Sequence, residues 1–123
     1  MTIMEAIVRT DALKHNTYTN NDKIAWLSRL DSMVKRLIID THECSDNIFY
    51  TDYDDDTSME LELLVPPPFD EIYLRWLEAQ IDYANGEYDK YNNSILMYQA
   101  AWDAYANHYN RNHMPKGSAI RYF

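Results

Sequence analysis

Apolar side chains recur at alternating steps of three and four along residues 88–109, with Asp, Asn, Gln and Lys between them. One face of a helix through this segment is therefore apolar and the opposite face polar. Most of these apolar residues are aromatic, and such rings bury a large area for little loss of rotamer entropy. We interpret the stripe as the core seam of a helical bundle rather than an aromatic ligand box; part of it could also be a subunit interface, which would satisfy the tyrosine hydroxyls. Its members are Tyr88, Tyr91, Ile95, Tyr98, Trp102, Tyr105 and Tyr109.

A second helical pattern covers residues 20–43. Thr19, with Asp22 three residues later, resembles a capping box that would begin this helix, and Thr2 could cap a short helix before it. We expect one broad face in the core. That face carries Trp26, Leu27, Leu30, Met33, Val34, Leu37 and Ile38. The opposite, solvent-facing side carries Arg29, Asp31, Ser32, Lys35 and Arg36.

A third helix is predicted over residues 69–85, after three consecutive prolines that cannot all be helical. Asn85 and Gly86 end it or kink it. Because the junction is so short, this helix and the next, over residues 87–112, are expected to pack as an antiparallel pair. Each main helix has one tryptophan near the shared core, and Trp102 in particular is expected to be buried. The three are Trp26, Trp76 and Trp102.

These patterns predict an all-α single domain over residues 1–123: a bundle of three main helices with a short N-terminal helix. Two glycines and four prolines leave little turn chemistry for an all-β fold. Between the helices lies a long acidic loop, residues 44–68, in which residues 48–50 and 61–65 could form a small hairpin. An extended tail is expected over residues 114–123. A loop this long in a small domain is unusual and tends to be functional or disordered.

The net charge of −9 is concentrated in the middle of the chain. Residues 44–85 contain eleven acids and one base, Arg75. Such a segment argues against direct binding of a nucleic-acid backbone, which needs clustered Lys and Arg. The segment could equally be a solvated loop without a partner. Its densest part consists of Asp52, Asp54, Asp55 and Asp56.

No motif for catalysis, a cofactor or a metal emerges from the sequence. Asp52, Asp54 and Asp56 imitate the start of a calcium loop, but Thr57 and Leu63 occupy the positions where that loop needs Gly and Glu. The chain has no glycine-rich phosphate loop and no Glu-x-x-His pair for a di-iron bundle. We therefore expect no enzyme activity, no cofactor and no metal.

Three further features concern the compartment and the surface. The only cysteine, Cys44, excludes an internal disulfide and suits a reducing cytoplasm. Residues 1–13 mix charged with apolar residues, unlike a signal peptide, and no apolar run approaches the length of a membrane span. Glu78 and Asp82, one turn apart, are interpreted as part of a solvated helix face.

Three stretches carry a resemblance to a known family. They read Leu-Val-Pro-Pro-Pro-Phe-Asp-Glu-Ile-Tyr at 64–73, Trp-Leu-Glu-Ala-Gln-Ile-Asp-Tyr-Ala-Asn-Gly-Glu at 76–87 and Tyr-Asn-Arg-Asn-His-Met-Pro-Lys-Gly at 109–117. Together they resemble the helical head–tail connector proteins of tailed bacteriophages, also called adaptor or head-completion proteins, which lie under the portal. The resemblance covers a little under half of the chain, and its motifs are structural rather than catalytic.

The resemblance implies a structural virion protein in the neck, assembled in the host cytoplasm. It implies a ring of about twelve copies that extends the portal channel and joins head to tail. The implied partners are the chain itself, the portal protein and a tail-side connector or stopper protein, while DNA passes through the channel without sequence-specific binding. Membranes play no part. The acidic residues Asp52, Asp54, Asp55 and Asp56 would then line the channel or pair with a neighbour's bases.

The main alternative is an acidic DNA mimic that inhibits a host nuclease or another DNA-binding protein. Such a mimic should spread its acids at phosphate-like spacing over a long surface, whereas here they are bunched in one segment, which favours the connector.

The C-terminal tail is the candidate docking segment, because its apolar residues alternate about Arg121 as in a short strand. We expect it to bind the portal or the adjacent subunit. The docking residues are Lys116, Ile120, Arg121, Tyr122 and Phe123.

Overall fold

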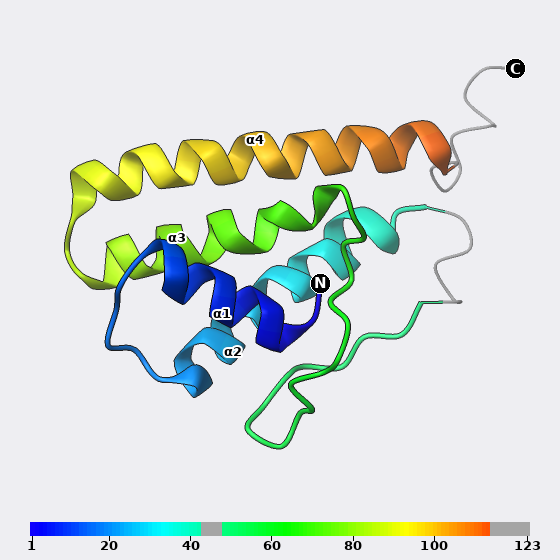
Figure 1. The fold of residues 1–123 in the computed structure, drawn as a ribbon. Coiled ribbons are helices and arrows are strands. Elements are labelled where there is room, and N and C mark those ends of the chain that lie inside the picture. The colour runs from blue at the N-terminus through cyan, green and yellow to red at the C-terminus, as the bar shows by residue number, and fades with distance from the viewer. Residues whose placement is uncertain (43–47, 114–123) are drawn as a thin grey trace, which may run out of the picture.

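The computed structural model describes residues 1–42 and 48–113 and confirms the all-α prediction (Figure 1). Within these ranges no strand is formed. The expected second helix ends as a π-helix, and the third begins with a short 3-10 turn. The elements are α1 (Ile3–Leu13), α2 (Asn20–Val34), the π-helix η1 (Lys35–Ile39), the 3-10 turn η3 (Phe69–Glu71), α3 (Ile72–Ala84) and α4 (Tyr88–Asn112).

Helix α3 is the centre of the bundle and packs against α1, α2 and α4. Helix α4 runs antiparallel to α3 along one side of it, while α1 and α2 lie on the other side (Figure 1). Gly86, with φ of 73°, takes the left-handed conformation that ends α3. The amide of Gly86 bonds the Tyr83 carbonyl and the amide of Glu87 bonds the Asp82 carbonyl, which together form a Schellman motif. The predicted antiparallel pair is therefore confirmed.

Both predicted N-caps are present. The Thr2 hydroxyl accepts the amide of Glu5 at 3.1 Å. Thr19 and Asp22 form a reciprocal capping box: the Thr19 hydroxyl accepts the Asp22 amide at 3.2 Å, and the Asp22 carboxylate accepts the Thr19 amide at 3.4 Å. Short-range sequence signals thus set where α1 and α2 begin.

The suggested hairpin between residues 48–50 and 61–65 is wrong for the described residues. The amides of Ile3 and Met4 have no partner inside α1, as at any helix N-terminus, and they bond the carbonyls of Leu61 and Met59 at 3.1 and 2.9 Å. Thr2 and Glu62 form an isolated antiparallel bridge. Residues 59–63 therefore pair with the start of the chain rather than with residues 48–50.

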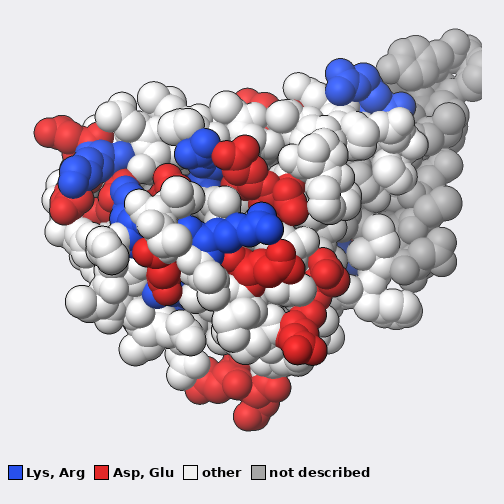
Figure 2. All heavy atoms as spheres, in the orientation of Figure 1, with Lys and Arg blue, Asp and Glu red and all other residues white. Residues whose placement is uncertain are grey.

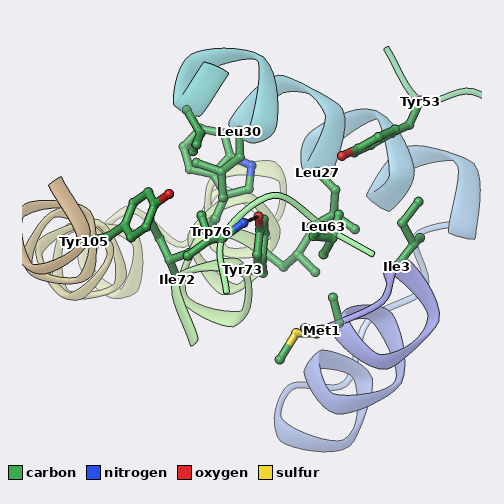
Figure 3. Packing of buried hydrophobic residues seen from close by; sticks show 14 of the residues in the cluster. Met1, Ile3, Leu27, Leu30, Tyr53, Leu63, Ile72, Tyr73, Trp76 and Tyr105 are labelled. Atoms are coloured by element: carbon green, nitrogen blue, oxygen red, sulfur yellow. Dashed lines mark hydrogen bonds between the residues drawn. The ribbon is translucent and has the colours of Figure 1, made fainter. Parts of the chain in front are cut away.

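The core lies where α1, α2, η1, α3, α4 and the loop before η3 meet, and Figure 3 labels residues from most of these elements, including Tyr105 of α4. Trp76 is buried, and its indole N–H donates to the Trp26 carbonyl at 2.7 Å. Trp102 is only partly buried, contrary to expectation, because α4 packs mainly on α3 and η3 and leaves one side of Trp102 open. Trp26 is also partly exposed.

Asp82 is fully buried, so its assignment to a solvated face is wrong. Its carboxylate accepts hydrogen bonds from Lys14 Nζ and from the Ser94 hydroxyl, each at 2.5 Å. The three residues come from the segment after α1, from α3 and from α4. This cluster ties the turn end of the α3–α4 pair to the N-terminal part of the chain.

Asp31, expected on the solvent side of α2, is also fully buried. Its carboxylate accepts the hydroxyls of Tyr53 at 2.5 Å and Tyr73 at 2.7 Å, and the amide of Leu64 at 3.2 Å. The Tyr73 oxygen in turn accepts the amide of Val65 at 2.7 Å. One carboxylate on α2 thereby holds the acidic loop at Tyr53 and at Leu64, on either side of the acidic turn, and Tyr73 of α3 holds Val65.

Burial raises the pKa of Asp31, although the hydrogen bonds from Tyr53, Tyr73 and Leu64 act in the opposite direction. A carboxyl group whose pKa is higher in the folded than in the unfolded state contributes stability at low pH, and this contribution is lost as the pH rises through the folded-state value.

Trp76→Ala should lower the free energy of unfolding by about 3–5 kcal/mol, because it empties a core site and removes the donor to Trp26. Trp102→Ala should lower it by only about 1–2 kcal/mol, because part of that ring already contacts water. Urea denaturation of both variants measures the difference. Equal losses would contradict the partial exposure of Trp102.

Asp31→Asn should reveal the titration of the buried carboxyl group. As the pH falls through the raised pKa of Asp31, the wild type should gain stability relative to this variant, by up to about 1.4 kcal/mol per pH unit where the group takes up its proton. The measurement is urea denaturation at several pH values. The control is Asp11→Asn: partial burial would raise the pKa of Asp11, but Lys23 and Asn16 together lower it, so this difference should stay flat above pH 4.5. A flat or falling difference for Asp31→Asn would refute the assignment.

Candidate functional site

Two candidate sites were predicted from the sequence, the C-terminal tail and the acidic segment, and the structure describes only the second. The tail residues Lys116, Ile120, Arg121, Tyr122 and Phe123 lie outside the described residues. The acidic segment is described, and it divides into two parts. Asp52 lies in a surface groove beside Arg36, whereas Asp54, Asp55 and Asp56 form an exposed turn.

The acidic turn, residues 54–57, is held by its own hydrogen bonds. The Asp54 carboxylate accepts the amide of Asp56 at 2.9 Å, and the Thr57 hydroxyl accepts the amide of Asp54 at 2.9 Å. Within the described part of the chain, none of the three aspartates forms an ion pair. Acidic side chains gather at the lower tip of Figure 2, where the loop turns in Figure 1. The turn therefore presents uncompensated negative charge on a defined backbone.

The end of the second helix departs from the regular pattern at Lys35. The amide of Asp40 bonds the carbonyl of Lys35, five residues earlier, and the ion pair between the two side chains spans the same turn. The wider turn rotates the residues that follow. Ile38 stays in the core, as the regular pattern predicts, whereas Ile39 is buried as well and Leu37 is 62% exposed. The assignment of Leu37 to the core face is therefore wrong, because it assumed a regular helix.

Three adjoining depressions lie along the outer side of α2 and η1. The first, of about 420 Å³, shares Met33 and Leu37 with one toward α4, of about 390 Å³. It shares Ser32, Arg36 and Asp52 with another toward the loop, of about 470 Å³. We call the continuous surface the α2 groove. Its main lining residues are Arg29, Ser32, Met33, Arg36, Leu37, Asp52, Tyr98 and Trp102.

The α2 groove is apolar at one end, where Asp103 also lies, and carries charges of both signs toward the other. At that end Asp52 lies beside Arg36. Met33, Leu37 and Trp102 form the apolar end, against α4. Arg29 and Arg36 are exposed and form no ion pair with any described residue. Of the other Lys and Arg residues in the described ranges, only Arg111 shares this property. Two of the three unpaired cations thus line one groove.

The end of η1 is anchored to α4 beyond the apolar end of the groove. The buried His42 ring has Nδ1 2.5 Å from the Ile38 carbonyl and Nε2 2.6 Å from the Asn110 side-chain oxygen. The same ring packs edge-on against Tyr109. This anchor holds η1 and α4 at a fixed spacing, so the groove between Leu37 and Trp102 has fixed walls.

Sequence reasoning missed this groove because its apolar residues have the periodicity of a core face. Met33, Leu37 and Trp102 all fitted buried positions. Arg29 and Arg36 were recognised as solvent-facing, but nothing in the pattern indicated that they border an apolar depression. The groove has the mixed composition of a protein-binding surface, with an apolar part and a charged rim.

Among residues 1–42 and 48–113, no group of three or more His, Cys, Asp and Glu side chains is placed to hold a metal ion. None of the helices in these ranges is long and apolar enough to cross a membrane. The comparisons with known proteins add no assignment: no family model, no curated protein and no solved structure matches this chain.

Leu37→Ala and Ile38→Ala form a matched pair that tests the π-helix. Leu37→Ala should change the free energy of unfolding by no more than about 0.5 kcal/mol, because the side chain lies in water. Ile38→Ala, one residue later, should lower it by about 2–5 kcal/mol, because Ile38 is 4% exposed. Thermal and urea unfolding measure both. A large loss for Leu37→Ala would contradict the exposure of Leu37 and support a regular helix that places it in the core.

Proposed function

We propose that this chain is a structural virion protein, a head–tail connector that forms a ring beneath a bacteriophage portal and extends the DNA channel. Its partners would be further copies of itself, the portal protein and a tail-side connector or stopper protein, in the neck of the virion. The proposal starts from the resemblance of residues 64–117 to connector proteins. It assigns no catalytic role to any residue.

The observation that carries the proposal is the exposed acidic turn. Asp54, Asp55 and Asp56 project into solvent without cations nearby, in a chain where most other described charges are paired. Negative charge on the wall of a DNA conduit would repel the duplex and keep it sliding, and the same charge at a subunit edge would attract a neighbour's bases. Either use suits a connector.

The motifs behind the resemblance also have a consistent structural role. Residues 76–87 include most of α3 and the Schellman turn at Gly86, and residues 109–112 are the last turn of α4. These two stretches therefore lie in one antiparallel helix pair, while residues 64–73 lead into α3 through η3. A shared helix pair is what a common scaffold would require.

The alternative function, an acidic DNA mimic, is less well supported by the same surface. A mimic needs carboxylates along a length of duplex, whereas here the unpaired acids with the highest density occupy one four-residue turn. In addition, the outer side of α2 presents Arg29 and Arg36, which would repel a cationic DNA-binding site.

The test is native mass spectrometry of the chain with and without the portal protein from the same source. A connector should form a ring on the portal, and a variant lacking residues 118–123 should keep its helical content and melting temperature while its portal binding drops sharply. Unfolding of the truncated chain would instead place the tail in its own core. A full-length chain that ignores the portal but inhibits a host nuclease would establish the alternative.

A further inference from the structure

We propose that the α2 groove is the docking site for the acidic turn of a second copy of this chain. The contact would join Arg29 and Arg36 of one copy to Asp55 and Asp56 of the next. The role of this contact in a ring rests on the proposed connector function. The contact itself is argued from the groove and the acidic turn described above.

The groove has the two properties that a protein partner needs. It contains an apolar surface that water covers at a cost, from Met33, Leu37 and Trp102. Beside it stand two guanidinium groups with no carboxylate partner in the described chain. Guanidinium groups are suited to bidentate recognition of carboxylates, so an acidic loop with apolar residues next to it is the complementary ligand.

The acidic turn is such a loop. It follows Tyr53 and precedes Leu61, and these two line a shallow depression together with Phe49. Phe49 is 88% exposed and Leu61 is 41% exposed, so apolar surface lies beside the charged turn. One chain thus contains both a groove with two unpaired arginines and an apolar end, and an acidic projection with an apolar side.

The turn is preorganised by its own hydrogen bonds, and it begins two residues after Asp52, which lines the groove of the same chain. Tyr53 binds Asp31 and Ser28 on α2, so the loop crosses α2 there before the turn begins. Residues 59–62 then run back to the start of α1. The turn projects beyond α2, which leaves its carboxylates available to another copy at little cost in ordering entropy.

Groove and turn are different patches, so the contact is heterologous. Each copy offers one groove and one turn, and a head-to-tail contact of this kind closes into a ring when the rotation per copy permits. The proposal therefore commits the acidic turn to pairing with a neighbour's bases rather than to lining the channel.

The test uses two charge-reversal variants of the full chain. The groove variant carries Arg29→Glu and Arg36→Glu. The turn variant carries Asp55→Lys and Asp56→Lys and keeps Asp54, whose carboxylate holds the turn together. The control variant is Arg111→Glu, which reverses an exposed, unpaired cation on α4. Self-association is measured by sedimentation velocity and native mass spectrometry, for the chain alone and with the portal protein.

Each reversal alone should weaken self-association by roughly tenfold or more, since attraction becomes repulsion at two exposed pairs. The control should associate like the wild type. An equimolar mixture of groove and turn variants should assemble again, because every groove then meets a turn of opposite charge. One chain with all four changes should also assemble by itself. Added salt should weaken the wild-type contact.

Rescue in the mixture would establish the contact, because general destabilisation cannot be rescued by a second damaged chain. Wild-type association by either single variant, or a wild type that never self-associates even on the portal, would overturn it. The connector proposal has a separate readout. If the chain assembles through the groove but does not bind the portal, the contact is supported and the connector function is contradicted. If it binds the portal but its assembly does not respond to the charge reversals, the connector function is supported and the contact is contradicted.

Discussion

The position of the acidic loop depends on the buried carboxylate of Asp31. Burying a carboxylate is expensive unless hydrogen bonds replace its water, and here Tyr53, Tyr73 and the amide of Leu64 do so. These donors come from the loop and from α3, so the same oxygen atoms that need partners also join three parts of the chain. A hydrophobic contact could hold the loop near α2, but directional bonds to one group also fix its path.

That path has consequences on both sides of the loop. Toward the N-terminus, residues 59–63 supply carbonyls to the unpaired amides of α1, so helix α1 is completed by a segment that is not helical. Toward solvent, the turn after Tyr53 is held away from the bundle, and its carboxylates meet no cation of the described chain. The exposed charge is thus a product of the interior hydrogen bonds, and the proposed contact between copies depends on them.

The α2 groove has a different origin, in the packing of α4 and in the π-helix at the end of α2. Helix α4 packs along α3 rather than over α2, which leaves Trp102 half covered. Within the π-helix Ile39 is buried beside Ile38, and Leu37 faces outward. The burial of the isoleucine side chains offsets the less favourable hydrogen-bond geometry of the π-helix. The exposed Leu37 adds apolar surface beside Arg29 and Arg36. Placed on one chain, this surface and the acidic turn supply two unlike patches, as a head-to-tail ring requires.

Local chemistry in the sequence determined much of the fold. The caps at Thr2 and Thr19, the end of α3 at Gly86 and the helical class follow from hydrogen bonds and periodicities within a few residues, and all were predicted correctly. The candidate docking tail lies beyond the described residues, and of the acidic segment the sequence indicated the charge but not its division into a groove residue and a turn.

Only the tertiary structure decided what becomes of residues whose partners are distant. Asp31 and Asp82 look like surface acids in a helical pattern, and Leu37 and Trp102 look like core. Periodicity describes one helix alone, whereas burial depends on which other elements cover it. The donors to Asp31 lie 22 to 42 residues away, and a single π-turn changes the face that Leu37 occupies. The pattern of a chain fixes its helices, and packing between them decides which polar groups are enclosed and which apolar groups remain open to a partner.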